Sequence, residues 1–187
     1  MRRTALTCLL SLLLAVPAAF AGEVGGVKLE DKVAVGGQDL VLNGAGIRTK
    51  LMFKVYVGAL YVPAKAANLD AVLARSPRRV QMTLLRDLSA DDLVGALVDG
   101  LEANNPPAEL ATLKPQTDQM VALMKAIGQA KTGGVVTIDF VDGETRLAYA
   151  GKSLGAIPGA PFNAALMRVW LGEKPAQADL KKAMLGG

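Results

Sequence analysis

The chain has 187 residues, with 21 Lys and Arg against 17 Asp and Glu, a single cysteine and no histidine. These counts exclude Ser-His-Asp triads, histidine general bases and Cys/His zinc sites. Aromatic residues make up only 4% of the chain and the charges are dispersed, which argues against a nucleic-acid interface. We therefore expect no metal, no cofactor and no nucleic-acid partner.

The first 21 residues have the pattern of a secretory signal peptide. Two arginines precede an apolar run, and Ala19-Phe20-Ala21 matches an A-x-A cleavage site. The apolar run is shorter than the roughly 20 residues of a transmembrane helix. We expect cleavage after Ala21 and export to a bacterial periplasm or the medium, without stable membrane insertion. Residues 22–187 then have the length of a single domain, and Cys8 is lost with the peptide.

The first half of this domain is predicted to be mostly β-structure. Residues 25–44 contain short β-branched runs between glycine pairs, which indicates one or two strands with tight turns. Residues 48–62 alternate over their whole length and predict one long strand, ended by Pro63. A short helix over 67–76 follows, and residues 78–88 predict another strand. Asn68 is a suitable N-cap for the short helix.

The middle of the chain is predicted to be helical. Ser89 is placed to cap a helix over residues 89–105, with an apolar stripe at Leu93, Leu97 and Leu101. A second helical region covers residues 106–130 and should be interrupted at Pro115, because proline cannot donate the hydrogen bond that an intact helix requires.

The last part of the chain is predicted to form a hairpin followed by two helices. Two strands within 133–155 flank Asp142-Gly143, a strong two-residue turn signal. Helices are expected over 161–172 and 176–186. This order of elements lacks strict βα alternation, so it predicts an α+β fold, with a large antiparallel sheet covered on one face by helices.

The predicted strand over residues 48–62 has two different faces. Its odd-numbered positions from Leu51 to Tyr61 are all apolar, whereas its even-numbered positions include Arg48, Lys50, Lys54 and Tyr56. One interpretation is an ordinary half-exposed strand. The other is a cleft where Arg48 and Tyr56 meet an anionic, partly apolar ligand, because a guanidinium binds a carboxylate with two parallel hydrogen bonds and a phenol can donate a third. The pattern leaves both interpretations open.

Several segments in order resemble the chalcone isomerase-like family. They are "GAGIR" and "KVYVGALYV" on the predicted strand, "RD" at residues 86–87, the hairpin "VVTIDFVDGETRLAYAGKSLGAIPG" and the segment "FNAALMRVWLGEKPAQADLKKAMLG". The segment "GVKLEDKVAVGGQDLVLNG" is similar to the exported bacterial branch. The resemblance implies an α+β fold, an open-faced sandwich with a large antiparallel sheet under a helical layer and a ligand cleft between them.

The resemblance also implies which residues matter. Arg48 matches an arginine of the plant chalcone isomerases, and Tyr56 stands where those enzymes have a threonine. Val169 stands near their late-helix threonine or serine, and their middle-helix tyrosine and asparagine have no match here. The fatty-acid-binding branch, which is not catalytic, resembles this chain better at its "VY" pair. Trp170 is a further candidate for ligand contact, with a core position as the alternative.

We therefore expect a non-catalytic binding protein for a small amphipathic carboxylate, similar to a fatty acid, with Arg48, Tyr56 and Trp170 as candidate ligand contacts. The alternative is an isomerase of the chalcone isomerase class acting on a flavonoid-like or other substrate, in which Arg48 would be catalytic. A third possibility is an interaction protein whose cleft is vestigial.

Overall fold

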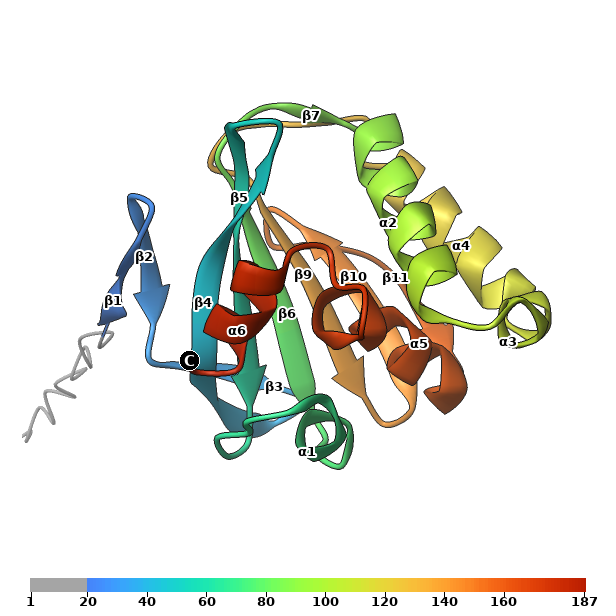
Figure 1. The fold of residues 1–187 in the computed structure, drawn as a ribbon, viewed down its shortest axis with the longest axis horizontal. Helices are drawn as coiled ribbons and strands as arrows, with labels where there is room; N and C mark the ends of the chain where they lie inside the picture. The colour runs from blue at the N-terminus through green and yellow to red at the C-terminus, as the bar shows by residue number, and fades with distance from the viewer. Residues whose placement is uncertain (1–19) are drawn as a thin grey trace, which may run out of the picture.

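The computed structural model describes residues 20–187 (Figure 1). The expected signal peptide therefore lies almost entirely outside the described residues. The strands are β1 (Phe20–Val24), β2 (Val27–Glu30), β3 (Lys32–Val35), β4 (Gln38–Lys50), β5 (Phe53–Val62), β6 (Arg78–Leu84), β7 (Leu88–Ser89), β8 (Gln129–Ala130), β9 (Val135–Val141), β10 (Glu144–Tyr149) and β11 (Lys152–Pro158). The helices are α1 (Leu69–Leu73), α2 (Ala90–Asn104), α3 (Pro107–Thr112), α4 (Lys114–Lys125), α5 (Ala160–Leu171) and α6 (Ala178–Met184).

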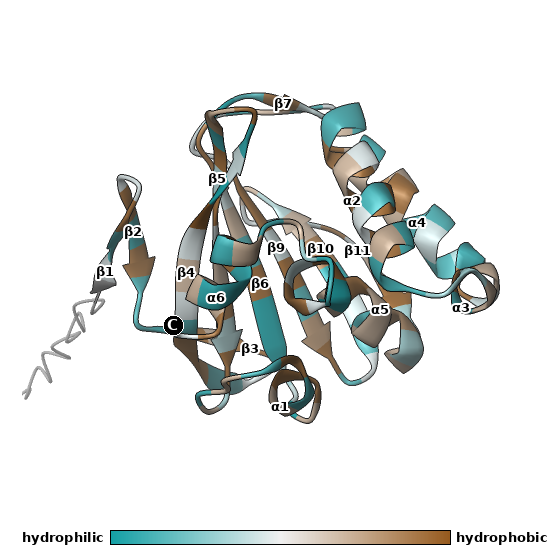
Figure 2. Cartoon of the chain, viewed as in Figure 1, coloured by the Kyte–Doolittle hydropathy of each residue, from teal (hydrophilic) through white to brown (hydrophobic). Residues whose placement is uncertain are grey.

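The predicted α+β fold with a large antiparallel sheet is confirmed. Seven strands pair in the order β11-β10-β9-β6-β5-β4-β3, and every pairing is antiparallel. The main hydrophobic core lies between one face of this sheet and the helices, with buried side chains from β5, β6 and β9 meeting those of α2, α4 and α5. Figure 2 shows mostly hydrophobic residues on the central strands, whereas α2 and α4 carry both kinds, as expected of helices with one buried side.

The opposite face of the sheet is also covered near β4 and β5. A second, smaller core forms there between the sheet and the β1–β2 hairpin. It contains Leu29, Val33, Val35, Leu40, Val57, Ala59, Tyr61 and Val141. Of the odd-numbered positions of the sequence pattern, Val57, Ala59 and Tyr61 face this smaller core, whereas Leu60 and Val62 at even-numbered positions face the helices. Both faces of β5 are buried over its second half.

The prediction of one long strand over residues 48–62 is wrong. β4 ends at Lys50 and β5 begins at Phe53, and these two residues pair across a two-residue turn. Leu51 and Met52 form that turn with φ angles of 48° and 69°. Such turns normally contain Asn-Gly or Asp-Gly because both residues need a positive φ. Leucine and methionine carry no turn signal, so the alternating pattern concealed the hairpin.

The predicted helix boundaries agree well with the structure. Asn68 caps α1 by accepting a hydrogen bond from the Ala71 amide, and Ser89 caps α2 with a complete capping box that includes Asp92. The three leucines predicted as the apolar stripe of α2 are buried. The second helical region divides into α3 and α4 immediately before Pro115, which lies in the first turn of α4.

The late hairpin is confirmed, and it continues into a third strand. Asp142 and Gly143 adopt φ angles of 54° and 78° between β9 and β10, as the turn prediction requires. A second turn of the same kind at Ala150 and Gly151, with φ angles of 49° and 78°, leads into β11. The sequence interpretation missed this second turn because its first residue is alanine, which unlike asparagine or aspartate gives no turn signal before a glycine.

Candidate functional site

Arg48 and Tyr56 are direct cross-strand neighbours. From the turn, Lys50 pairs with Phe53 and Thr49 pairs with Lys54, but the register then shifts so that Arg48 pairs with Tyr56. The shift is a β-bulge in which Val55 is the extra residue. Opposed residues of an antiparallel pair project from the same face. Arg48 and Tyr56 therefore lie side by side, whereas Lys54, predicted to share their face, belongs to the neighbouring pair.

Trp170 completes this group from the helical layer. It lies on α5, is buried, and its Nε1 donates a hydrogen bond of 3.1 Å to the Tyr56 hydroxyl oxygen. Burial raises the pKa of Tyr56 above its usual value, and the hydrogen bond from Trp170 and the positive charge of Arg48 offset part of that rise. The phenol is therefore neutral at physiological pH and keeps a proton that it can donate.

Arg48 is a half-buried cation without a carboxylate partner. Its Nη1 donates a hydrogen bond of 2.6 Å to the main-chain oxygen of Thr49. None of the ion pairs among residues 20–187 includes Arg48. A guanidinium has five N–H donors, so most of its hydrogen-bonding capacity is available to an anion.

Helix α6 packs against the same face of β4 and β5. Three glycines, Gly44, Gly46 and Gly58, allow this close approach, since an added Cβ would lie 2.8 Å from the Ala183 side chain at Gly46 and 3.3 Å from Leu180 at Gly58. Before α6, Gln177 Oε1 accepts a hydrogen bond of 2.7 Å from the Thr49 amide. These contacts place α6 over the glycines and hold its start beside Arg48.

Two hollows lie elsewhere on the described molecule. One, with a volume of about 600 Å³, is lined by residues of the α2–α3 junction and the end of α5, and the other, of about 340 Å³, lies beside the C-terminus. Neither is lined by Arg48, Tyr56 or Trp170. The three predicted residues thus come together away from both of these hollows.

Sequence reasoning missed a polar cluster in the larger hollow. Arg168 Nη1 donates to Asn105 Oδ1 at 2.6 Å and to Glu109 Oε1 at 2.9 Å. Asn105 is buried and donates to the main-chain oxygens of Leu101 and Ala165. Because this arginine is paired and its asparagine partner is satisfied, the cluster joins α2, α3 and α5 structurally. Its only sequence signals are an arginine two residues before Trp170 and an asparagine pair at the end of a predicted helix.

Val169, where the resemblance implies a hydroxyl residue, is a core residue. It is buried, and a Cβ added at Gly100 of α2 would lie 2.6 Å from its Cγ1. Its side chain therefore fills the contact between α5 and α2. A hydrogen-bonding group is absent from this position of the helix.

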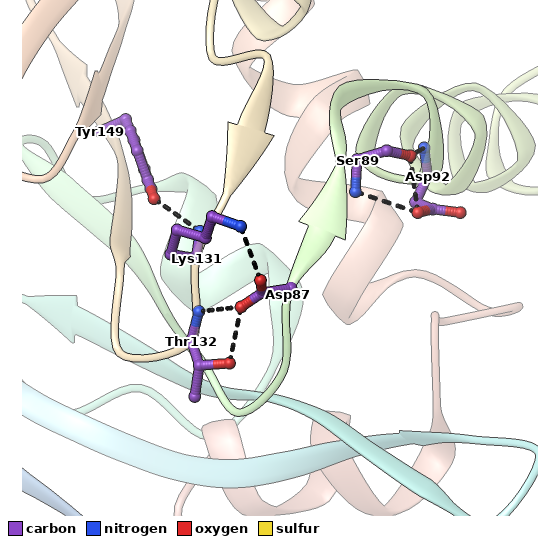
Figure 3. Close-up of polar contacts among 6 residues, drawn as sticks. All are labelled: Asp87, Ser89, Asp92, Lys131, Thr132 and Tyr149. Atoms are coloured by element: carbon purple, nitrogen blue, oxygen red, sulfur yellow. Dashed lines mark hydrogen bonds and ion pairs between the residues drawn. The ribbon is translucent and has the colours of Figure 1, made fainter.

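Asp87, the second residue of the Arg86-Asp87 pair in the family resemblance, connects two loops (Figure 3). Asp87 accepts hydrogen bonds from Lys131 Nζ at 2.9 Å, the Thr132 amide at 2.8 Å and the Thr132 hydroxyl at 2.9 Å. The bond from Lys131 and then those from Thr132 lower the pKa of Asp87 to about 2. The Tyr149 hydroxyl accepts from the Lys131 amide beside it. Asp87 is exposed and holds the segment after β6 against the segment before β9.

The described part of the chain has neither a metal-binding cluster nor a membrane-spanning helix. Residues 20–187 contain no group of three or more carboxylate, histidine or cysteine side chains placed to hold a metal ion. No helix among them is long and apolar enough to span a membrane.

Comparison with known proteins agrees with this architecture. A family model described as chalcone isomerase-like matches residues 21–186. No curated protein sequence matches. The crystal structure of a fatty-acid binding protein from Arabidopsis thaliana has the same fold, with a TM-score of 0.68 and 13% sequence identity over 86% of this chain and 92% of that one. The chain therefore belongs to the chalcone isomerase-like family.

Proposed function

We propose that this protein binds a small amphipathic carboxylate of the fatty-acid type, without catalysing a reaction on it. The observation that supports this proposal is Arg48, a half-buried arginine without a carboxylate partner that lies beside the neutral hydroxyl of Tyr56. The Arabidopsis structure with the same fold is described as a fatty-acid binding protein, which supports the ligand class.

The proposed headgroup contacts have distinct chemical roles. Arg48 binds the carboxylate with two parallel N–H groups, which a planar guanidinium can do and an ammonium cannot. Trp170 donates to the Tyr56 oxygen, so the tyrosine proton remains available for the carboxylate. Trp170 thus acts as a positioning residue that holds the phenol next to Arg48.

The apolar tail would lie between the sheet and α6. Gly44, Gly46 and Gly58 provide a surface without side chains, against which Leu180 and Ala183 of α6 pack. Because Leu180 and Ala183 lie directly over these glycines, a tail at this place requires α6 to move away from them. The helix has only seven residues and buries two large side chains, Leu180 and Met184. It is therefore one of the smaller structural units of the fold, and such units can open locally without unfolding of the whole domain.

We also propose that the protein works outside the cytoplasm. The positive region, apolar run and A-x-A site at the N-terminus support export. With cleavage after Ala21, β1 would retain Gly22, Glu23 and Val24, each of which pairs with β2.

Calorimetric titration of a long-chain fatty acid tests the headgroup assignment. Charge-assisted hydrogen bonds contribute roughly 1.5–3 kcal/mol, so Arg48→Ala should weaken binding about ten- to a hundredfold. Arg48→Lys should recover only part of the affinity. Arg146→Ala is the matched control, because Arg146 is an exposed arginine paired with Glu144 on β10. Unchanged affinity in Arg48→Ala would contradict the headgroup assignment, and no binding by the wild type would contradict the ligand class.

A further inference from the structure

The tip of the β4–β5 hairpin exposes three consecutive large hydrophobic side chains. Leu51 is 82% exposed, Met52 94% and Phe53 60%, and these are the exposed large hydrophobic residues of the described chain. In Figure 1 this turn lies at the end of the sheet near β7, away from α1 and the C-terminus.

The backbone conformation of the turn is unfavourable for the two residues that form it. Leu51 and Met52 both have a positive φ, which L-residues with bulky side chains adopt at a free-energy cost. An Asn-Gly pair would suit the same two-residue turn better. Their side chains also make little contact with the protein, given their exposure. The apolar character of the tip therefore serves contact with something outside the chain.

Cations surround the tip. Lys50 and Lys54 flank the turn on its two strands, and the Arg86 guanidinium lies 5.0 Å from the centre of the Phe53 ring. None of the three forms an ion pair within residues 20–187. Asp92 is a carboxylate close to Lys50 and Arg86. Hydrogen bonds from Ser89 chiefly lower its pKa, with smaller contributions from Lys50 and Arg86, and its side chain is engaged in the cap of α2.

We propose that this hairpin tip docks on an anionic lipid surface. Leu51, Met52 and Phe53 would enter the boundary between headgroups and acyl chains, while Lys50, Lys54 and Arg86 contact anionic headgroups. A protein partner fits this surface less well, because a specific protein interface buries roughly 800 Å² on each side, far more than a three-residue turn provides. The proposal is independent of the fatty-acid ligand.

Vesicle co-sedimentation of the full chain without its expected signal peptide tests the proposal. Vesicles of phosphatidylcholine with phosphatidylglycerol should retain the protein, whereas vesicles of phosphatidylcholine alone should retain much less, and added salt should weaken the binding. The variant Leu51→Asn/Met52→Gly removes the apolar side chains and supplies the preferred turn residues. It should lose at least tenfold in vesicle affinity while its Tm stays the same or rises.

Two further variants separate charge from general effects of turn mutation. Lys50→Glu/Lys54→Glu should weaken binding to anionic vesicles at low salt. Ala150→Asn alters another exposed two-residue turn with a positive φ, between β10 and β11, and should bind vesicles as the wild type does. Equal binding by the wild type and Leu51→Asn/Met52→Gly, or no wild-type binding to anionic vesicles, would overturn the proposal. Loss of a wild-type dimer in the tip variant without vesicle binding would instead assign the tip to self-association.

Discussion

Gly44 of β4 lies where α6 approaches the sheet most closely, and Gly44→Ala tests how that helix is held. A Cβ added at Gly44 would lie 2.0 Å from the main-chain oxygen of Ala183 and 3.1 Å from both the Gly186 nitrogen and the Met184 oxygen. Non-bonded contacts to carbon are favourable only at roughly 3.5–4.0 Å. The clash is with backbone, so a rotamer change cannot relieve it. The C-terminal end of α6 must move by more than about 1 Å.

Two estimates bound the loss of stability in Gly44→Ala. Overpacking of a well-packed site costs typically about 1–3 kcal/mol. Complete detachment of α6 would expose Leu180 and Met184, which are fully buried, at roughly 1.5–3 kcal/mol each. Partial displacement lies between these limits. We expect the free energy of unfolding to fall by about 2–4 kcal/mol.

Urea unfolding followed by circular dichroism measures this change. Gly95→Ala is the matched control, because Gly95 lies inside α2, is exposed, and would have no atom within 4 Å of an added Cβ. There alanine should stabilise the protein by about 0.5–1 kcal/mol, since glycine is the poorer helix former. A loss below about 0.5 kcal/mol in Gly44→Ala, or similar changes in both variants, would refute the view that α6 rests on a glycine surface.

Three further predictions concern acid stability, catalysis and export. The pKa of Asp87 is lowered from 3.8 to about 2 on folding, so its stabilising contribution is present above pH 4 and is lost as the pH falls toward 2. Asp87→Asn should therefore lower the urea midpoint at pH 7 and match the wild type near pH 2. Chalcone should not be turned over at ordinary rates of ~1 s⁻¹ or faster, because Tyr56 and Val169 replace hydroxyl residues of the plant enzymes, and loss of its visible absorbance measures this. N-terminal sequencing of secreted or periplasmic material should begin at Gly22, whereas material beginning at Met1 would contradict export.

The elements that the sequence predicted well are those whose signals are local. The cap and apolar stripe of α2 are fixed within one stretch of chain, as are the interruption at Pro115 and the turn at Asp142-Gly143. Their order was enough to predict the antiparallel α+β fold. The sequence did not predict the turn at Leu51-Met52, because this positive-φ conformation is disfavoured for leucine and methionine. A propensity argument cannot detect a turn that surrounding strand pairing imposes.

The candidate site was predicted less completely because most of it depends on contacts between distant segments. The hydrogen bond between Trp170 and Tyr56 joins residues 114 positions apart. The packing of α6 on Gly44, Gly46 and Gly58 likewise depends on a helix more than 100 residues downstream. Glycine in a strand is compatible with the close approach of another segment, and the tertiary structure identifies that segment as α6. The polar cluster of Arg168 had no distinctive local pattern at all.

The sequence predicted that Arg48 and Tyr56 share one face of a single strand, and the structure places them on a common face of two paired strands instead. In one straight strand these residues share a face because their separation is even. In a regular hairpin with a two-residue turn at Leu51-Met52, Arg48 would instead pair with Val55, and Tyr56 would project from the opposite face. The bulge at Val55 adds one residue to β5 and brings Tyr56 opposite Arg48. The candidate site therefore depends on a single irregular residue between the turn and the sheet, which supports the interpretation of bulges near functional positions as features that aim side chains.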